Sequence, residues 1–598
     1  MKGSLMRLLQ GGLLAALIGC ASPVTAPVQG LSAIVTPATA MGGGPALKPA
    51  SAIAEASELG DSRVLKVRLL AFNDFHGQLE PEGLSLRLRT PQPMTVPAGG
   101  AAWLAGLLDR LRGEVRHSIT VSGGDLVGAS PLVSAAQEDL PTIEVMNALG
   151  LDLGVVGNHE FDRGLAHLRR LQAAARFPMI AANVIDAQGA PVFAPSVVRE
   201  IEGVRIAFVG AVLRSTPEIV RPSGIAGLRF LDEADSINQE VQRLQAQGIR
   251  AIVAVIHEGG RIQGDWNDPA CPGAQGPIFA IARRLPAEVD VVLSGHTHQG
   301  YHCVIEEPRQ KGLRIVQAVA NGRAVSMIDL AIDRRTGDVD RAATRGQNLP
   351  VANGLEATDE VRRAYPPERA SAVVAAQVQA LVEQARPVAQ QVIGRVDGPI
   401  TRTVSPGGDS PLGRWVADAQ LALTRPPEAG GAQIALMNPG GLRTDLRCVP
   451  AQAPCAIRMA DAFAVQPFGN PLVVMTLTGA QLMQVLEQQF TGANATRPRL
   501  LQPSEGFGWA WRARARNGRH VAQAWLNGRP IEPHASYRVV VNEFLAAGGD
   551  GFTALTQGTD RVGGPMDLEA LVMTLGRVSI SRAPEPARLQ RLPDEDPR

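Results

Sequence analysis

The chain has 598 residues, of which 45% are hydrophobic, and its formal net charge at pH 7 is +1. This length is too great for one hydrophobic core, so the composition predicts a globular protein of two domains with flexible segments attached. The near-zero net charge gives no support to nucleic acid as a partner, because nucleic-acid binding usually requires a strongly basic face.

The first 19 residues have the pattern of a secretory signal peptide. Lys2 and Arg7 precede an apolar run at 13–18 that is too short to span a bilayer. The run ends in Leu-Ile-Gly-Cys, which resembles the lipobox of bacterial lipoproteins, so Cys20 is the expected lipidation site. An ordinary cleaved signal with an incidental cysteine is the alternative.

We therefore expect an exported lipoprotein of the cell envelope, facing the periplasm or anchored in the outer membrane. The lipid anchor would be its only contact with the membrane. Residues 20–62 are rich in Ala, Pro, Gly, Ser and Thr without sustained periodicity, which predicts a flexible tether.

Four further cysteines make an even number in an exported chain, which favours disulfides. We expect Cys448 to pair with Cys455 across a small proline-containing loop, and Cys271 to pair with Cys303. A zinc cluster is disfavoured because the sequence contains no C-x-x-C spacing.

From residue 63 to 350, apolar runs typical of strands alternate with helical patterns, which predicts an α/β domain with much parallel pairing. A helix is expected over 101–111, a surface loop over 81–100, and strands over 64–72, 119–122, 151–156, 205–212, 251–256 and 289–293.

Polar residues follow five of these predicted strands directly. An isolated histidine is more often a surface or core residue than a ligand, but five histidines share this position, namely His76, His159, His257, His296 and His298. With neighbouring carboxylates and an amide they form an oxygen and nitrogen ligand set that suits two divalent ions such as Zn, Mn, Fe or Co. Two such ions suit the hydrolysis of a phosphate ester. The predicted ligands are Asp74, His76, Asp125, Asn158, His257, His296 and His298.

A second region follows a predicted helix over 370–391, which we expect to lie in a linker at 351–391. Gly407 to Gly413 should open another helix, and strands are expected before Asn438 and over 472–477 and 539–541. The second domain is expected at 392–580, and the charged, proline-rich residues 581–598 are expected to form a loose tail.

The motifs D-x-H, G-G-D, G-N-H-E-F-D, a lone His and G-H-x-H, in this order, resemble those of the calcineurin-like metallophosphoesterases. The later stretches N-P-G-G-L-R, Q-P-F-G-N and N-E-F followed by G-G-D-G-F are similar to those of the 5'-nucleotidase family. The resemblance covers about residues 65–574. It implies a four-layer α/β/β/α catalytic domain at 63–350, a linker helix, and an α/β substrate-binding domain that rotates to bring substrate to the metals.

The resemblance also implies a role for each motif residue. One metal would be held by Asp74, His76 and His298, the other by Asn158, His257 and His296, with Asp125 bridging them. His159 would stabilise transition-state charge and assist the leaving alkoxide, and Asp162 would orient its ring. Glu160 and Phe161 are expected to be structural.

In the second domain, the family resemblance makes Phe468 and Phe544 an aromatic sandwich for the nucleobase and Asp550 a ribose-binding carboxylate. Arg443 and Arg402 would grip phosphate. Asn438 would contact the base, although Pro439 replaces a family glycine beside it. Without the family, these aromatics could be core residues, the Gly-Asp-Gly segment a turn, and Arg443 a solvated charge.

The sequence thus predicts hydrolysis of nucleoside 5'-monophosphates to nucleoside and phosphate by a hydroxide that two divalent metals (Zn, Mn or Co) activate. Alternative activities are 2',3'-cyclic nucleotide phosphodiesterase, nucleotide-sugar or dinucleotide pyrophosphatase, and thiosulfohydrolase, the last disfavoured by the base clamp. The alternative from another class is a nucleotide-binding surface lipoprotein without turnover, for which His159 and Asp162 would be unnecessary.

Overall fold

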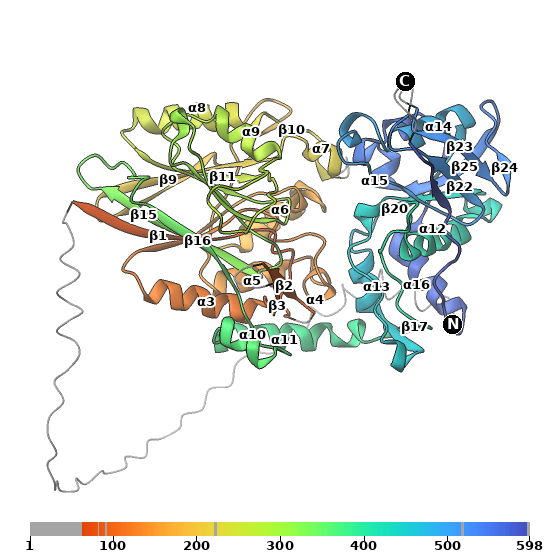
Figure 1. Ribbon diagram of the computed structural model, residues 1–598, viewed down its shortest axis with the longest axis horizontal. Coiled ribbons are helices and arrows are strands. Elements are labelled where there is room, and N and C mark those ends of the chain that lie inside the picture. Colours follow the sequence, from red (N-terminus) through yellow and green to blue (C-terminus); the bar gives the residue numbers. More distant parts are fainter. Residues whose placement is uncertain (1–62, 82, 90–92, 221–223, 516–518, 595–598) are drawn as a thin grey trace, which may run out of the picture. The chain divides into compact units, whose positions relative to one another are not determined.

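The computed structural model describes residues 63–594, except 82, 90–92, 221–223 and 516–518 (Figure 1). The predicted signal peptide, the lipidation site Cys20 and the tether at 20–62 lie outside the described residues. Within the described part of the chain, no helix combines the length and apolarity needed to cross a membrane.

The first region contains a six-stranded sheet in which four consecutive strands, β1, β4, β5 and β6, are parallel. Two antiparallel strands from the end of the region complete it beside β1. Its order is β16 (Arg345–Pro350), β15 (Ala324–Asp333), β1 (Val64–Phe72), β4 (Ser118–Ser122), β5 (Leu153–Val155) and β6 (Met179–Ile180).

A second six-stranded sheet has four parallel strands, β14, β12, β11 and β9, between two antiparallel edge strands. Its order is β13 (Gly300–Val304), β14 (Arg314–Ala318), β12 (Val291–Ser294), β11 (Ala251–His257), β9 (Val204–Val212) and β8 (Ser196–Ile201).

The two sheets pack face to face. Alternate residues of β1 and β9, such as Leu69 and Phe208, are fully buried in the core between them. Helices α3 (Ala101–Gly113), α5 (Leu140–Ala148) and α6 (Leu165–Ala174) pack in the core on the outer side of the first sheet. Helices α8 (Glu233–Ala246) and α9 (Pro277–Arg284) cover the second sheet. The region is therefore an α/β/β/α sandwich, as predicted (Figure 1).

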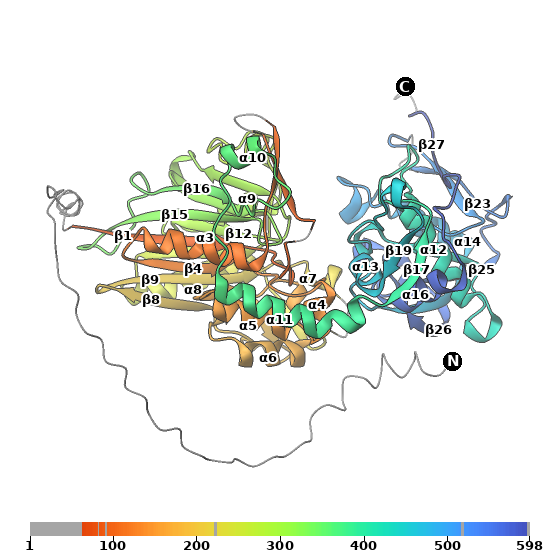
Figure 2. The ribbon, with the colours of Figure 1, turned by 90° about the horizontal axis from the view of Figure 1, so that it is seen from below.

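Helix α11 (Ala372–Ala389) corresponds to the predicted linker helix. Its buried residues, including Val374 and Leu381, join the core formed by α3 and α5. It runs alongside α5 and α4 (Leu132–Ala135) in Figure 2. The first region also contains a two-stranded sheet, in which β7 (Val184–Asp186) pairs with β10 (Leu228–Phe230). Its shorter helices include α7 (Thr216–Ile219) and α10 (Asp359–Ala364).

The second region is built on a five-stranded mixed sheet with helices on its faces. The order is β21 (Gln502–Pro503), β18 (Ile434–Met437), β25 (Ser536–Asn542), β20 (Pro471–Thr478) and β26 (Thr559–Met566). Helices α12 (Pro411–Thr424) and α16 (Asp567–Arg577) share one core with this sheet, and α14 (Gly479–Glu487) shares another. The Ser410 hydroxyl caps α12 by accepting from the Gly413 N–H.

The second region also contains two small sheets and two short α-helices. They are the pair β17 (Val392–Val396) and β19 (Cys455–Arg458), the sheet β24 (Arg529–Pro530), β23 (Val521–Leu526), β22 (Phe507–Trp511) and β27 (Leu589–Arg591), and helices α13 (Met459–Val465) and α15 (Glu543–Ala546).

Two predicted irregular segments carry structure. The expected surface loop at 81–100 contains a hairpin of β2 (Ser85–Leu88) and β3 (Met94–Pro97), because Leu86, Leu88 and Val96 find a small apolar core there. The expected loose tail contains β27, which pairs in parallel with β22. Leu589 is buried, and Arg588 forms a two-bond ion pair with Asp418 at 2.7 Å, so partners distant in sequence satisfy this charged segment.

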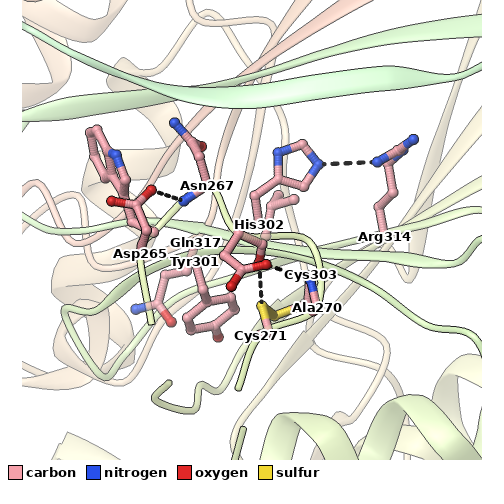
Figure 3. The surroundings of a disulfide bond; sticks show 12 residues. Asp265, Asn267, Ala270, Cys271, Tyr301, His302, Cys303, Arg314 and Gln317 are labelled. Atoms are coloured by element: carbon pink, nitrogen blue, oxygen red, sulfur yellow. Dashed lines mark hydrogen bonds between the residues drawn. A yellow bond between two sulfur atoms is a disulfide. The ribbon is translucent and has the colours of Figure 1, made fainter. Parts of the chain in front are cut away.

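Both expected disulfides are present. Cys448–Cys455 closes a short loop in the second region, and Cys271–Cys303 joins the loop after β11 to strand β13. The surroundings of the second bond include buried His302, whose Nε2 lies 3.4 Å from Nη1 of Arg314 (Figure 3).

Candidate metal centre and adjoining cavity

The ends of five strands bring all seven predicted metal ligands to one place. Two groups each contain ligand atoms that lie within 4.8 Å of one another, and Asn158 touches the second group. The groups are Asp74, His76 and His298, and Asp125, His257 and His296; a third such group, His76, Asp125 and His159, brings His159 to the same place. The carboxyl ends of parallel strands meet at one edge of a sheet, which explains why residues so distant in sequence converge.

The hydrogen bonds of His257 and His76 show that these donors fit a cation. Nδ1 of His257 lies 2.8 Å from the Gly123 carbonyl and must carry a proton, so a cation that displaces the other ring proton would meet a lone pair on Nε2. That nitrogen faces Asp125 Oδ2 at 3.0 Å and Asn158 Oδ1 at 3.1 Å. Similarly, His76 Nδ1 is bonded to the Gly128 carbonyl, and its Nε2 lies 3.0 Å from His298 Nε2. Facing lone pairs are satisfied when a divalent cation binds between them.

The charges within the cluster perturb its pKa values strongly. Burial opposes ionisation of both partners, yet the Asp125 carboxylate raises the pKa of His257 to about 10. Burial alone would raise the pKa of Asp125, but the charges of His257 and His159 hold it well below its usual range. Burial and the neighbouring His298 lower the pKa of His76 to about 3. Such a set of opposed shifts is typical of a functional site.

Backbone strain coincides with the same residues. Five of the seven predicted ligands have φ between 50° and 71°, a left-handed conformation that is uncommon outside glycine: Asp74, His76, Asp125, His296 and His298. The adjacent glycines are required for close approach. A Cβ on Gly157 would lie 2.2 Å from Asp125 Oδ1, and one on Gly124 would lie 2.5 Å from His257 Nδ1.

Glu160 connects two of the ligand loops. Its buried carboxylate accepts from the N–H groups of Gly157 at 2.7 Å, Leu126 at 2.8 Å and Asp125 at 3.1 Å. Burial and the charge of Asp125 raise its pKa to about 7. Sequence reasoning treated Glu160 as structural without identifying these contacts, which depend on two loops meeting in space. Phe161 is fully buried in the core beneath.

His159 and Asp162 lie beside the ligand cluster. His159 Nδ1 is 2.8 Å from Asp162 Oδ2, so the carboxylate accepts the ring proton and fixes the ring. Burial disfavours the charged imidazolium, but the carboxylates of Asp162 and Asp125 outweigh burial and raise the pKa of His159 to about 9. The backbone N–H of His159 also donates to Asp125 Oδ1 at 2.9 Å.

A cavity extends from this centre to the second region. Its empty volume is about 820 Å³ including open solvent. Residues of the second region reach the centre directly, because the Phe468 ring stacks on His159 with centroids 5.8 Å apart and the Arg443 guanidinium lies 5.7 Å from the Phe468 centroid. The predicted residues that line the cavity are Asn158, His159, Asp162, His296, Asn438, Arg443, Phe468, Phe544 and Asp550.

At the far end of the cavity, Asp550 is surrounded by donors. Asn438 Nδ2 donates to its Oδ2 at 2.9 Å, and Arg499 Nη1 donates to its Oδ1. Asn542 Nδ2 in turn donates to Asn438 Oδ1 at 2.9 Å. Arg499 and Asn542 line the cavity but were not predicted. Asn542 directly precedes the N-E-F motif, whereas no local pattern distinguishes Arg499 from the many other arginines.

Arg402 occupies a different environment from the other predicted substrate residues. It is not among the residues that line this cavity, and its Nε donates to Asp445 Oδ1 at 3.1 Å. Its Nη1 donates to the Leu442 carbonyl at 3.2 Å. In this conformation Arg402 stabilises the segment that carries Arg443 and does not itself reach the cavity.

Comparison with known proteins places both regions. Residues 67–300 match the family model of calcineurin-like phosphoesterase, and residues 392–557 match the 5'-nucleotidase C-terminal domain. The crystal structure of a 5'-nucleotidase precursor from Thermus thermophilus is similar with a TM-score of 0.71 and 28% identity, covering 88% of this chain and 99% of that one.

Two curated relatives are longer than this chain. Endonuclease YhcR of Bacillus subtilis is 29% identical over 521 residues, which is 85% of this chain but 39% of the relative. Cell wall protein Lmo0130 of Listeria monocytogenes is 31% identical over 532 residues, covering 82% of this chain and 64% of the relative. The chain therefore spans less than two thirds of the length of either.

The paired sheets and the ligand cluster at their edge define the first region as a calcineurin-like phosphoesterase domain. The second region is the domain that accompanies it in 5'-nucleotidases. The chain belongs to the 5'-nucleotidase family of the calcineurin-like phosphoesterases.

Proposed function

We propose that this protein hydrolyses nucleoside 5'-monophosphates to nucleosides and inorganic phosphate with two divalent metal ions. The observation that supports this most is the cavity shared by the ligand cluster and the second domain. Two predicted metal ligands, a histidine and carboxylate pair, two arginines, two aromatic rings and a further carboxylate all line it. These groups match a phosphate, a base and a ribose in one molecule.

We assign one metal to Asp74, His76 and His298 and the other to Asn158, His257 and His296, with Asp125 shared. The two ligand groups and the position of Asp125 support this division, since its Oδ2 lies 3.0 Å from His257 and 3.9 Å from His76. When bound, two divalent ions (Zn, Mn or Co) supply Lewis acidity and a nucleophilic hydroxide at neutral pH.

His159 is the proposed proton donor to the leaving alkoxide. Asp162 accepts from Nδ1, which leaves Nε2 as the nitrogen that donates to the 5' oxygen. The Asp162 and Asp125 carboxylates raise the pKa of His159, which favours the protonated ring whose positive charge would stabilise the transition state. Arg443 is the proposed phosphate ligand, because its planar fork of donors suits phosphate oxygens.

The rings of Phe468 and Phe544 are the proposed base-binding surfaces, and Asp550 is the proposed ribose ligand. Asn438 contributes to this subsite by donating a hydrogen bond from Nδ2 to Asp550. The hydrogen-bonding positions of its side-chain amide that this bond leaves unused would contact the base. Arg402 is proposed as a second phosphate ligand only if it leaves Asp445, so its contribution should be small.

The test is phosphate release from AMP by the purified protein with Mn²⁺ or Zn²⁺, repeated after chelation. Metal-dependent release is expected, and its absence would refute the proposed function and favour a nucleotide-binding lipoprotein. Faster turnover of 2',3'-cyclic AMP, a nucleotide sugar or a dinucleotide than of AMP would reassign the substrate. His159→Ala should lose activity while retaining metal, and full activity would refute its role.

We also propose that the protein is exported to the cell envelope and anchored there by a lipid on Cys20. The proposed domain division is a tether at 20–62, a catalytic domain at 63–350, a linker at 351–391, a substrate domain at 392–580 and a terminal segment at 581–598. Two disulfides support an oxidising compartment. Labelling with radioactive palmitate in a bacterial host should succeed for the native chain and fail for Cys20→Ser. Equal labelling would refute the anchor.

A further inference from the structure

The loop between α14 and β21 holds the proposed ribose carboxylate with two side chains. Asn494 Nδ2 donates to the backbone carbonyl of Asp550 at 2.8 Å, and Arg499 Nη1 donates to its carboxylate Oδ1. The loop is itself fixed, because the N–H of Leu501 donates to Gln489 Oε1 at 2.7 Å. The backbone of Asp550 has φ of 56°, a left-handed conformation, and the loop that holds this residue was indicated by no sequence motif.

The hydrogen-bond capacity left at this pair is specific. A carboxylate has about four lone-pair sites, and one on each oxygen of Asp550 is used, by Arg499 and by Asn438. One acceptor site therefore remains on each oxygen. The Arg499 guanidinium has about five N–H donors. Its side chain is 43% exposed and it lines the cavity, so donors remain available beside those two acceptor sites.

Two adjacent hydroxyl groups match this arrangement. Each hydroxyl has one proton to donate and lone pairs that accept, so a vicinal diol presents two donors and two acceptors. Asp550 alone accepts both protons but offers nothing to the hydroxyl oxygens. Arg499 supplies the missing donors. A phosphate group at the same place would instead face the Asp550 carboxylate, and the Arg499 charge is already compensated by it.

We propose that Arg499 is a specificity-determining residue that reads the intact 2',3'-diol of ribose together with Asp550, so that ribonucleotides are preferred over their 2'- or 3'-deoxy analogues. This inference rests on the proposed function, which places a nucleotide in the cavity. A site whose polar groups bond a hydroxyl rejects the analogue that lacks it, since those groups are left unpaired.

The experiment compares kcat/KM for AMP, 2'-deoxy-AMP and 3'-deoxy-AMP in the wild-type protein, Arg499→Gln and Arg499→Lys. Wild type should prefer AMP by about 10-fold. This factor lies toward the lower end of the range expected for loss of a hydrogen bond to a charged group, because Arg499 is partly exposed. Arg499→Gln should reduce this preference to about 2-fold by lowering AMP turnover selectively, and Arg499→Lys should retain part of it.

The matched control is Arg497→Gln, which removes an exposed arginine of the same loop that is not among the residues lining the cavity. It should keep the wild-type preference. If Arg499→Gln keeps the preference, or lowers all three substrates equally as a merely structural change would, the inference is overturned.

Equilibrium binding of adenosine and 3'-deoxyadenosine, followed by calorimetry, separates this inference from the proposed function. If phosphate release is absent, the proposed function fails. The inference still stands if adenosine binds about 10-fold more tightly than 3'-deoxyadenosine and Arg499→Gln reduces the difference to about 2-fold. Equal binding of the two nucleosides to wild type overturns it, whatever the turnover.

Discussion

Glu160→Gln tests whether a buried carboxylate outside the proposed metal ligand set positions Asp125, the proposed bridging carboxylate. The native side chain accepts three backbone N–H bonds of 2.7 to 3.1 Å. An amide keeps one oxygen, so if that oxygen retains the two bonds from Gly157 and Asp125, the new NH₂ group faces the N–H of Leu126. One buried N–H then loses its acceptor, which costs about 1–3 kcal/mol.

The displaced loop carries Asp125, so metal binding should weaken as well. Changes in groups that support ligands typically cost about 10- to 100-fold in metal affinity or activity. Urea unfolding of the metal-free protein measures the first effect, and calorimetric titration with Mn²⁺ measures the second. Glu144→Gln is the control, because it removes an exposed carboxylate of α5. Native stability and native metal affinity in Glu160→Gln would refute the reasoning.

Three further outcomes are expected. Asp162→Asn removes a carboxylate that raises the pKa of His159, so the alkaline limb of the pH–rate profile should move to lower pH. The value of kcat should also fall about 10- to 100-fold. An alkaline limb at the wild-type pH would contradict the role assigned to Asp162. His302 is buried with a pKa lowered to about 4, so the unfolded chain binds its proton first, and this residue should contribute a loss of stability of about 3 kcal/mol as pH drops from 6.5 toward 4. In urea unfolding over this pH range, His302→Gln should lose less stability than wild type by about that amount, whereas His534→Gln, at an exposed site, should follow wild type; parallel slopes for all three proteins would exclude a contribution of His302. Chelation followed by dialysis should lower both the Tm and the rate of AMP hydrolysis, and added Mn²⁺ should restore them. The Tm changes because an ion that binds only the folded state stabilises that state. An unchanged Tm would contradict the proposed metal site.

Much of the fold was predictable because the signals are local. Strand β1 was predicted with its observed bounds, Val64–Phe72, since a short, mainly apolar run that ends in polar turn residues is typical of a buried strand. The polar residues at strand ends were predictable for the same reason. The hairpin at 85–97 and strand β27 were missed, because their few apolar residues become buried only through partners elsewhere in the chain.

The sequence by itself determined the strand and helix order, the residue types available as ligands, and the His159 and Asp162 spacing that places both on one short turn. Tertiary structure alone decided which atoms face one another. In the folded chain, Glu160 accepts hydrogen bonds from two loops, Arg402 donates to Asp445, and Arg499 donates to Asp550. The physical reason is that motif spacing and hydrophobic period act within a few residues, whereas hydrogen bonds between loops depend on how the sheets and domains pack.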